Sequence, residues 1–123
     1  MGLLKTPTSL PFNITRMGYV VLTSTNLDKT RFFYESGLGL EVTFHDEEMI
    51  CFRSIEETFH HSLVFEKTDD NGPGKCRKVG YRMQTDSDIK EAYDFFTERG
   101  DIVSYVERPF QGLTIEVIDG IGV

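Results

Sequence analysis

A strand, a polar step and an amphipathic helix follow one another in residues 17–42. The strand is the apolar run Met17–Leu22, and Asn26 is suited to capping the helix that comes next. The helical period stops at Gly37, and glycine is a common residue at the end of a helix. This pattern constrains the fold more than any other feature, because residues 78–103 repeat it.

In the second copy, apolar residues alternate along the strand from residue 79 to 83, Asp86 can cap the helix and Gly100 ends it. Two such units in one small domain indicate an internal duplication. Each helix has a single apolar stripe, as expected for packing on the outer face of one sheet. The residues that we expect to be largely buried are Leu27, Phe33 and Tyr34 in the first helix, and Ile89, Ala92, Tyr93 and Phe96 in the second.

Length and charge exclude several classes of protein. The chain has 123 residues, 39% hydrophobic and 27% charged, which predicts one globular domain. A net charge of -7 and the lack of a Lys/Arg run argue against nucleic-acid binding. No stretch approaches the roughly 20 apolar residues of a membrane span, and the apolar core of residues 1–13 is too short for a signal peptide. We therefore predict a cytoplasmic protein without a membrane partner.

The two cysteines predict no disulfide framework. Cys51 lies in an apolar strand, Cys76 lies in a Gly/Pro loop, and no CxxC motif is present. Reduced thiols without a structural role are the expectation.

The remaining turn signals divide the chain into segments. We predict an extended arm at 1–16, which Pro7 and Pro11 keep from being helical, and one domain at 17–123. The domain consists of a first module at 17–67, a linker at 68–77 and a second module at 78–123. Further strands are predicted at 40–45, 49–53, 62–67, 102–107 and 113–118, and turns at 46–48, 54–59, 108–112 and 119–122.

With these elements placed, the sequence resembles the vicinal oxygen chelate superfamily, which contains glyoxalase, bleomycin resistance protein and extradiol dioxygenase. The resemblance rests on TRMGYVVLTSTNLDKTRFFYESGLGLEVT, MICFRS and IEETFHHSLVFEK in the first module. With the arm KTPTSLPFNITR, these segments are most similar to the amino-terminal domain of two-domain extradiol dioxygenases of the homoprotocatechuate/catechol 2,3-dioxygenase type. KVGYRMQTDSDIKEAYDFFTERG and TIEVIDGIG extend the resemblance more loosely into the second module.

The resemblance implies an α+β fold of paired βαβββ modules, with the second module lacking its last strand. In the family that strand lies beside the first strand of its module. We therefore predict that the backbone of residues 78–84 has an open side, which a neighbouring chain, the arm at 2–13 or residues beyond the sequence would fill.

The resemblance also implies where a catalytic module pair would hold Fe(II) or Mn(II) with two histidines and one glutamate. The first histidine position is Tyr19 here, and the second is Lys78 or Arg77. The glutamate belongs on the strand that this sequence lacks. None of the three positions carries the family's ligand, and a cationic side chain opposes a divalent metal. We predict no catalytic, cofactor-binding or metal-binding residue in this chain.

His60 and His61 are the rival metal ligands. Adjacent residues on a strand point to opposite faces, so we expect only one of the two imidazoles to face inward, as a hydrogen-bonded core residue. By resemblance, this HHxL run recurs in the amino-terminal domain, where the metal is not bound. We expect two acidic clusters to be solvated, namely His45 with Asp46, Glu47 and Glu48, and Glu56 with Glu57.

These observations favour a non-catalytic amino-terminal domain of an extradiol dioxygenase, an oxidoreductase of aromatic catabolism. The metal and the small aromatic substrate would bind in the catalytic carboxyl-terminal domain of the parent. The expected partners of this chain are that domain or another copy in a homo-oligomer. Two alternatives remain: a standalone bleomycin-resistance-like binding protein with an aromatic-lined concavity, and a glyoxalase-like metalloenzyme whose site is completed across a dimer.

Overall fold

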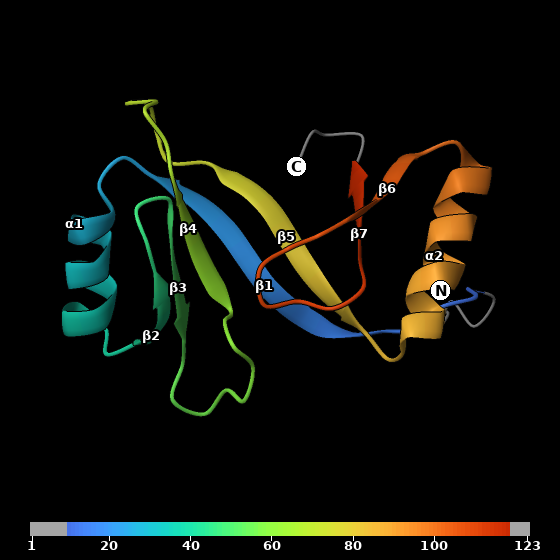
Figure 1. Cartoon of the computed structure of the whole chain (residues 1–123), viewed down its shortest axis with the longest axis horizontal. Helices are drawn as coiled ribbons and strands as arrows, with labels where there is room; N and C mark the ends of the chain where they lie inside the picture. Colours follow the sequence, from blue (N-terminus) through green and yellow to red (C-terminus); the bar gives the residue numbers. More distant parts are fainter. Residues whose placement is uncertain (1–9, 119–123) are drawn as a thin grey trace, which may run out of the picture. The chain divides into compact units, whose positions relative to one another are not determined.

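The computed structural model of the protein describes residues 10–118 (Figure 1). The elements in this part of the chain follow the predicted order. They are β1 (Ile14–Ser24), α1 (Leu27–Arg31), η2 (Phe32–Gly37), β2 (Glu41–His45), β3 (Met49–Arg53), β4 (Leu63–Lys67), β5 (Cys76–Met83), α2 (Asp86–Arg99), β6 (Ile102–Val106) and β7 (Thr114–Ile118). Residues 1–9 and 119–123 lie outside the described residues, as do most of the predicted arm and the predicted turn at 119–122.

Five strands form one sheet in the order β2-β3-β4-β1-β5. β1 and β4 are parallel, with Val20 opposite Leu63, while β3 pairs antiparallel with both β2 and β4. β6 and β7 form a separate antiparallel pair. The predicted hairpin and the α+β fold with a βαβββ first module are confirmed, and no described strand follows β7.

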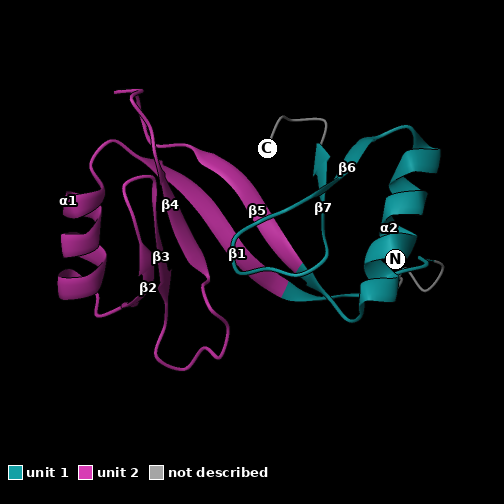
Figure 2. Cartoon of the chain, viewed as in Figure 1, with its two compact units in different colours: residues 1–16, 82–122 teal, residues 17–81, 123 magenta. Residues whose placement is uncertain are grey.

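The described residues divide into two compact units (Figure 2). Residues 17–81 form one unit, and residues 10–16 together with 82–118 form the other. The division crosses β1 and β5, so each of these strands contributes to both units. The module boundaries at 67 and 78 stay predictions.

In the unit of residues 17–81, apolar residues pack on both faces of the sheet because strand side chains alternate. On the α1 side, Leu27 lies against Ile50, Phe52 and Phe65. The other face carries a second buried cluster, formed by Val21, Cys51 and Val64. Both cysteines are free thiols, as predicted.

The first helix begins as predicted and then widens. The Asn26 side chain accepts a hydrogen bond from the Lys29 N–H at 3.0 Å, which confirms the cap. From Phe32 the helix becomes a π-helix, in which the Leu38 N–H donates to the Phe33 carbonyl five residues earlier at 3.1 Å.

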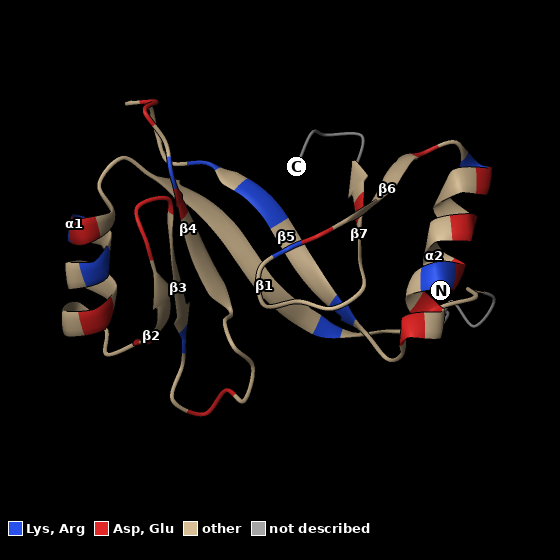
Figure 3. Ribbon diagram, in the orientation of Figure 1, with Lys and Arg blue, Asp and Glu red and all other residues tan. Residues whose placement is uncertain are grey.

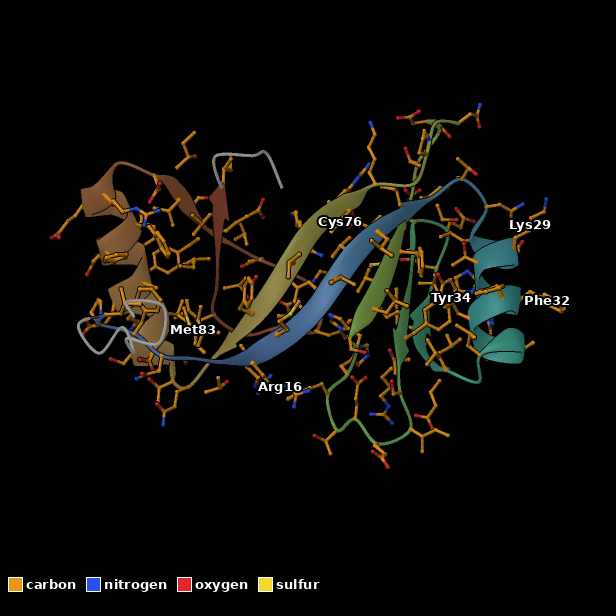
Figure 4. The ribbon with its side chains drawn as sticks, turned by 180° about the vertical axis from the view of Figure 1, so that it is seen from behind. Arg16, Lys29, Phe32, Tyr34, Cys76 and Met83 are labelled. Carbon is orange, nitrogen blue, oxygen red and sulfur yellow. The ribbon has the colours of Figure 1, made fainter. Side chains whose placement is uncertain are left out.

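The wider turn changes which side chains face the sheet. Phe33 is 56% exposed, so the prediction that it is buried was wrong. Tyr34 is half-buried and its ring lies 4.9 Å from that of Phe65. Figure 4 shows Tyr34 directed toward the sheet and Phe32 away from it. An α-helical period assigns Phe33 to the apolar stripe because it assumes 3.6 residues per turn throughout.

The other unit is built around α2 and the β6–β7 pair. Phe12, from the end of the predicted arm, is buried against Phe95 and Phe96, with ring centroids 5.5 and 5.7 Å away. Along the predicted stripe Ala92 is buried, whereas Ile89, Tyr93 and Phe96 are half-buried.

The N-cap of α2 is Thr85, and the prediction of Asp86 was wrong by one residue. The Thr85 hydroxyl accepts from the Asp88 N–H at 3.2 Å, and the Asp88 carboxylate accepts from the Thr85 N–H at 3.0 Å, so the two form a capping box. The Asn13 N–H also donates to Asp88, at 3.1 Å. Gly100 ends α2 with a left-handed φ of 89°, as predicted.

The Asp88 carboxylate should make the stability of this unit depend on pH. Hydrogen bonds from the Thr85 side chain, and from the N–H groups of Asn13 and Thr85, hold the pKa of Asp88 below its ordinary value of 3.8. A lowered pKa gives a stabilisation that is present when the pH is above the ordinary pKa and is lost as the pH falls through the pKa of the folded protein.

We expect Asp88→Asn to lower the free energy of unfolding near pH 7, and the difference from wild type to shrink below about pH 4. Urea unfolding at several pH values measures this, and Asp94→Asn, an exposed position on the same helix, is the control. An equal Asp88→Asn effect at pH 7 and pH 3 would contradict the prediction.

Candidate functional site

The candidate site lies around Tyr19 and His61, on the sheet face opposite α1. Tyr19 packs with the buried cluster on that face. Backbone hydrogen bonds of Ser62 connect the segment of His61 to the segment of Tyr19. The Val20 N–H donates to the Ser62 carbonyl at 3.0 Å, and the Ser62 N–H donates to the Phe52 carbonyl at 2.9 Å. The rings of Tyr19 and His61 then meet edge to face, with centroids 5.2 Å apart.

The other side of the Tyr19 ring lies against the backbone of β5. A Cβ atom added at Gly80 would lie 2.2 Å from Cε1 of Tyr19, far inside contact distance. Gly80 therefore makes the room that this ring position requires.

The two histidines face each other. The Nδ1 atoms of His60 and His61 lie 3.0 Å apart, so one imidazole donates a hydrogen bond to the other. The expectation that they point to opposite faces was wrong, because it assumed a strand there. Both residues lie in the loop that precedes β4, where strand alternation does not apply. His61 is the buried member at 8% exposure, as expected for a single inward imidazole, and His60 is half-buried.

Glu57 closes the loop that carries these histidines. Its carboxylate accepts from the Ser54 N–H at 2.9 Å and from the Ser62 hydroxyl at 2.6 Å, so it joins the two ends of the loop. The Arg53 guanidinium adds a hydrogen bond to the Phe59 carbonyl at 3.3 Å. The expectation of a solvated Glu57 was therefore wrong, whereas Glu56 is exposed.

The acidic hairpin tip lines a shallow hollow of about 610 Å³. Asp46, Glu47 and Glu48 are exposed as expected, and Asp46 accepts from two backbone N–H groups of its own turn. His45 is half-buried, and its Nδ1 lies 3.2 Å from Nη1 of Arg31. The lining contains four acids, one lysine and no phenyl or phenol ring. This hollow is not the aromatic-lined concavity expected of a standalone binding protein.

Comparison with known proteins assigns the fold. Residues 16–118 match the family model of the Glyoxalase/Bleomycin resistance protein/Dioxygenase superfamily. The chain belongs to this superfamily. No curated protein matches it, but solved structures of its fold do.

Two of the matched structures are dioxygenases from the same genus. An extradiol ring-cleaving dioxygenase from B. fuscum is 31% identical, with a TM-score of 0.81 over 96% of this chain and 33% of the dioxygenase chain. Homoprotocatechuate 2,3-dioxygenase from Brevibacterium fuscum, in an anaerobic complex with 3,4-dihydroxyphenylacetate, is 33% identical with a TM-score of 0.80, over 96% of this chain and 37% of that one. The chain thus spans about a third of the length of these dioxygenases.

The residues at the positions that the resemblance assigns to the ligands do not suit Fe(II) or Mn(II). Tyr19 offers a phenol oxygen as a possible donor, whereas the cation at the second position, Lys78 or Arg77, opposes a divalent metal. The Nδ1 atoms of the histidine pair are engaged with each other. Within residues 10–118, no three His, Cys, Asp or Glu side chains form a group that could hold a metal ion.

Sequence reasoning missed two contributors to this site, Gly80 and Glu57. A glycine inside a predicted strand is a signal of close approach, and Gly80 stands out in that way. Nothing in the sequence around Glu57 distinguishes it from Glu56, because its partners are the two ends of a loop.

The contact between Tyr19 and Gly80 predicts a coupled pair. We expect Gly80→Ala to lower the free energy of unfolding by about 1 to 3 kcal/mol, because the added methyl group displaces the Tyr19 ring. In a Tyr19→Ala background the same substitution should lower the free energy of unfolding by less, because the ring that the methyl group would contact is absent. Urea unfolding of the four proteins in this double-mutant cycle provides the measurement. Equal costs in both backgrounds would refute the coupling.

The Glu57 carboxylate predicts a difference between two adjacent acids. We expect Glu57→Ala to lower the free energy of unfolding by about 0.5 to 1.5 kcal/mol, because the Ser54 N–H and the Ser62 hydroxyl lose their acceptor in the loop. The matched control Glu56→Ala should change it by less than about 0.5 kcal/mol. Equal effects of the two substitutions in chemical unfolding would show that the Glu57 hydrogen bonds do not stabilise the loop.

Proposed function

We propose that this chain serves as the amino-terminal, non-catalytic domain of an extradiol dioxygenase that acts on a catechol-type aromatic. The observation that carries the proposal is the combination of a dioxygenase-like fold with unsuitable side chains at the ligand positions. The fold matches the dioxygenases over 96% of this chain but only 33% of theirs. The ligand positions carry Tyr19 and Lys78.

In this proposal the duplicated domain supplies packing surface and oligomer contacts to the catalytic half. The parent would bind Fe(II) or Mn(II) and the catechol in its carboxyl-terminal domain and would act in the cytoplasm. No helix among residues 10–118 is long and apolar enough to cross a membrane. The partner is then that catalytic domain or another copy of the chain.

The cross-dimer metalloenzyme remains the second candidate, because the structure favours it at one point. His60 and His61 lie together, with Tyr19 against His61. If the mutual hydrogen bond opened, both Nδ1 atoms would be available to one ion, and a second chain would have to supply the remaining ligands.

The two candidates differ in metal content. We expect the purified chain to contain no stoichiometric iron or manganese by elemental analysis. After reconstitution with Fe(II), it should not produce the yellow ring-cleavage product from catechols, because three converging ligands are needed at about 2.0 to 2.3 Å from the ion.

The outcome that contradicts the proposal is equally specific. Stoichiometric metal with turnover, both lost on His61→Ala but kept in the control His45→Ala, would establish the cross-dimer metalloenzyme. The control residue is a half-buried histidine at the hairpin tip, where its Nδ1 lies 3.2 Å from Nη1 of Arg31.

A further inference from the structure

Asn71 and Gly72 lie in the loop that joins β4 to β5, and both residues are exposed. Of the three asparagines in the chain, Asn71 alone is followed by glycine, whereas Asn13 and Asn26 precede branched aliphatic residues. An asparagine side chain can react with the backbone nitrogen of the next residue, and a glycine there has no side chain to hinder the approach. The sequence therefore favours this reaction at Asn71 over the other two positions.

The reaction is deamidation, and water is its only co-reactant. The backbone nitrogen of Gly72 attacks the side-chain carbonyl carbon of Asn71 and loses its proton, so a new C–N bond forms. The C–N bond to the side-chain amide breaks, and the amide leaves as ammonia with that proton. Water then opens the resulting succinimide at either carbonyl group, which leaves aspartate or isoaspartate at position 71.

The attacking nitrogen is engaged in the structure. The Gly72 N–H donates a hydrogen bond to Oδ1 of Asp70 at 2.9 Å. Oδ2 of the same carboxylate lies 3.2 Å from Nζ of Lys75, so the carboxylate has a partner on each side. Attack on Asn71 requires the Gly72 nitrogen to give up this hydrogen bond as well as its proton. The hydrogen bond to Asp70 therefore opposes the reaction.

The Asp70 carboxylate is ionised at neutral pH and can act only as an acceptor there. The hydrogen bond from the Gly72 N–H, and then the hydrogen bond and charge of Lys75, hold the pKa of Asp70 below its ordinary value of 3.8. Figure 3 shows the acids of this loop in red. The acceptor is thus in place under the conditions in which deamidation proceeds.

Both ends of the loop are fixed to β1. The Thr68 N–H donates to the Ser24 carbonyl at 2.9 Å, and the Lys75 N–H donates to the Thr23 hydroxyl at 3.0 Å. A change at Asn71 would fall between these two anchors. The product would add one negative charge to a chain whose net charge is already -7, and isoaspartate would also lengthen the backbone.

We propose that Asn71 is a site of spontaneous deamidation and that the hydrogen bond from the Gly72 N–H to Asp70 limits its rate. The modification would accumulate with the age of the folded chain. This inference goes beyond the proposed function and does not depend on it.

Incubation of the full chain at neutral pH, followed by peptide mapping with mass spectrometry, tests the proposal. Aspartate and isoaspartate should accumulate at position 71 but not at Asn13 or Asn26. In Asp70→Ala the conversion should be faster by about threefold to tenfold, as expected for the loss of one hydrogen bond that opposes the reaction. The matched control Asp69→Ala makes the same change in net charge in the same loop, and it should change the rate by less than about twofold.

Hydrogen exchange of the Gly72 amide provides a second measurement, which needs no variant. This amide should exchange more slowly in the folded chain than in the chain unfolded by urea, because its hydrogen bond to Asp70 must open first. In Asp70→Ala the difference should disappear.

Four results would overturn the proposal: no conversion at position 71, a rate in Asp70→Ala that is equal to or lower than that of the wild type, equal acceleration by Asp69→Ala, or an unprotected Gly72 amide in the folded wild-type chain. The metal and turnover assays measure the proposed function separately, so either idea can fail while the other holds.

Discussion

The parallel pairing of β1 with β4 is the interaction on which the rest of the first module depends. Two parallel neighbours cannot be joined by a tight turn, so the chain between them must cross over, and here it forms α1, η2 and the β2–β3 hairpin. The pairing also sets the position of Ser62 beside Val20, and through it the meeting of His61 with Tyr19. On its other side, β1 pairs with β5. A single central strand therefore positions both the histidine loop and β5.

The two faces of this sheet are covered by different kinds of structure. On one face the helix supplies Leu27 and Tyr34, and the π-helical turn brings Tyr34 onto Phe52 and Phe65 while it releases Phe33 to the exterior. On the other face a loop covers the sheet. The Glu57 carboxylate joins the two ends of this loop, and His61 of the loop packs against Tyr19. The first arrangement depends on apolar burial, and the second depends on the hydrogen bonds of one carboxylate to both ends of a loop.

The sequence predicted the elements well where local rules decide the structure. Strand alternation and turn residues located β3 to the residue, and Asn26 and Gly100 were correct as helix boundaries. The errors have several origins. The cap of α2 was misplaced by one residue, the π-helical turn moved Phe33, and His60 and His61 lie in a loop to which strand alternation does not apply. Glu57 obtained partners at both ends of its loop, which local pattern cannot indicate.

The contact between Tyr19 and β5 supports the proposal that this sheet face serves packing. A tyrosine at a ligand position needs room for its ring, and that room exists because Gly80 has no side chain. Glycine weakens a strand by itself, so a ring that covers its backbone compensates for the loss. Two residues before Gly80 on the same strand, Lys78 supplies a positive charge where a divalent ion would require a neutral or anionic donor. Restoring a metal site would therefore require more than exchanging Tyr19 for histidine, because the smaller ring would uncover Gly80 while the cation at Lys78 remained. The two positions that the resemblance assigns to ligands therefore meet at one short stretch of β5, and the residues found there are consistent with the packing role that we propose.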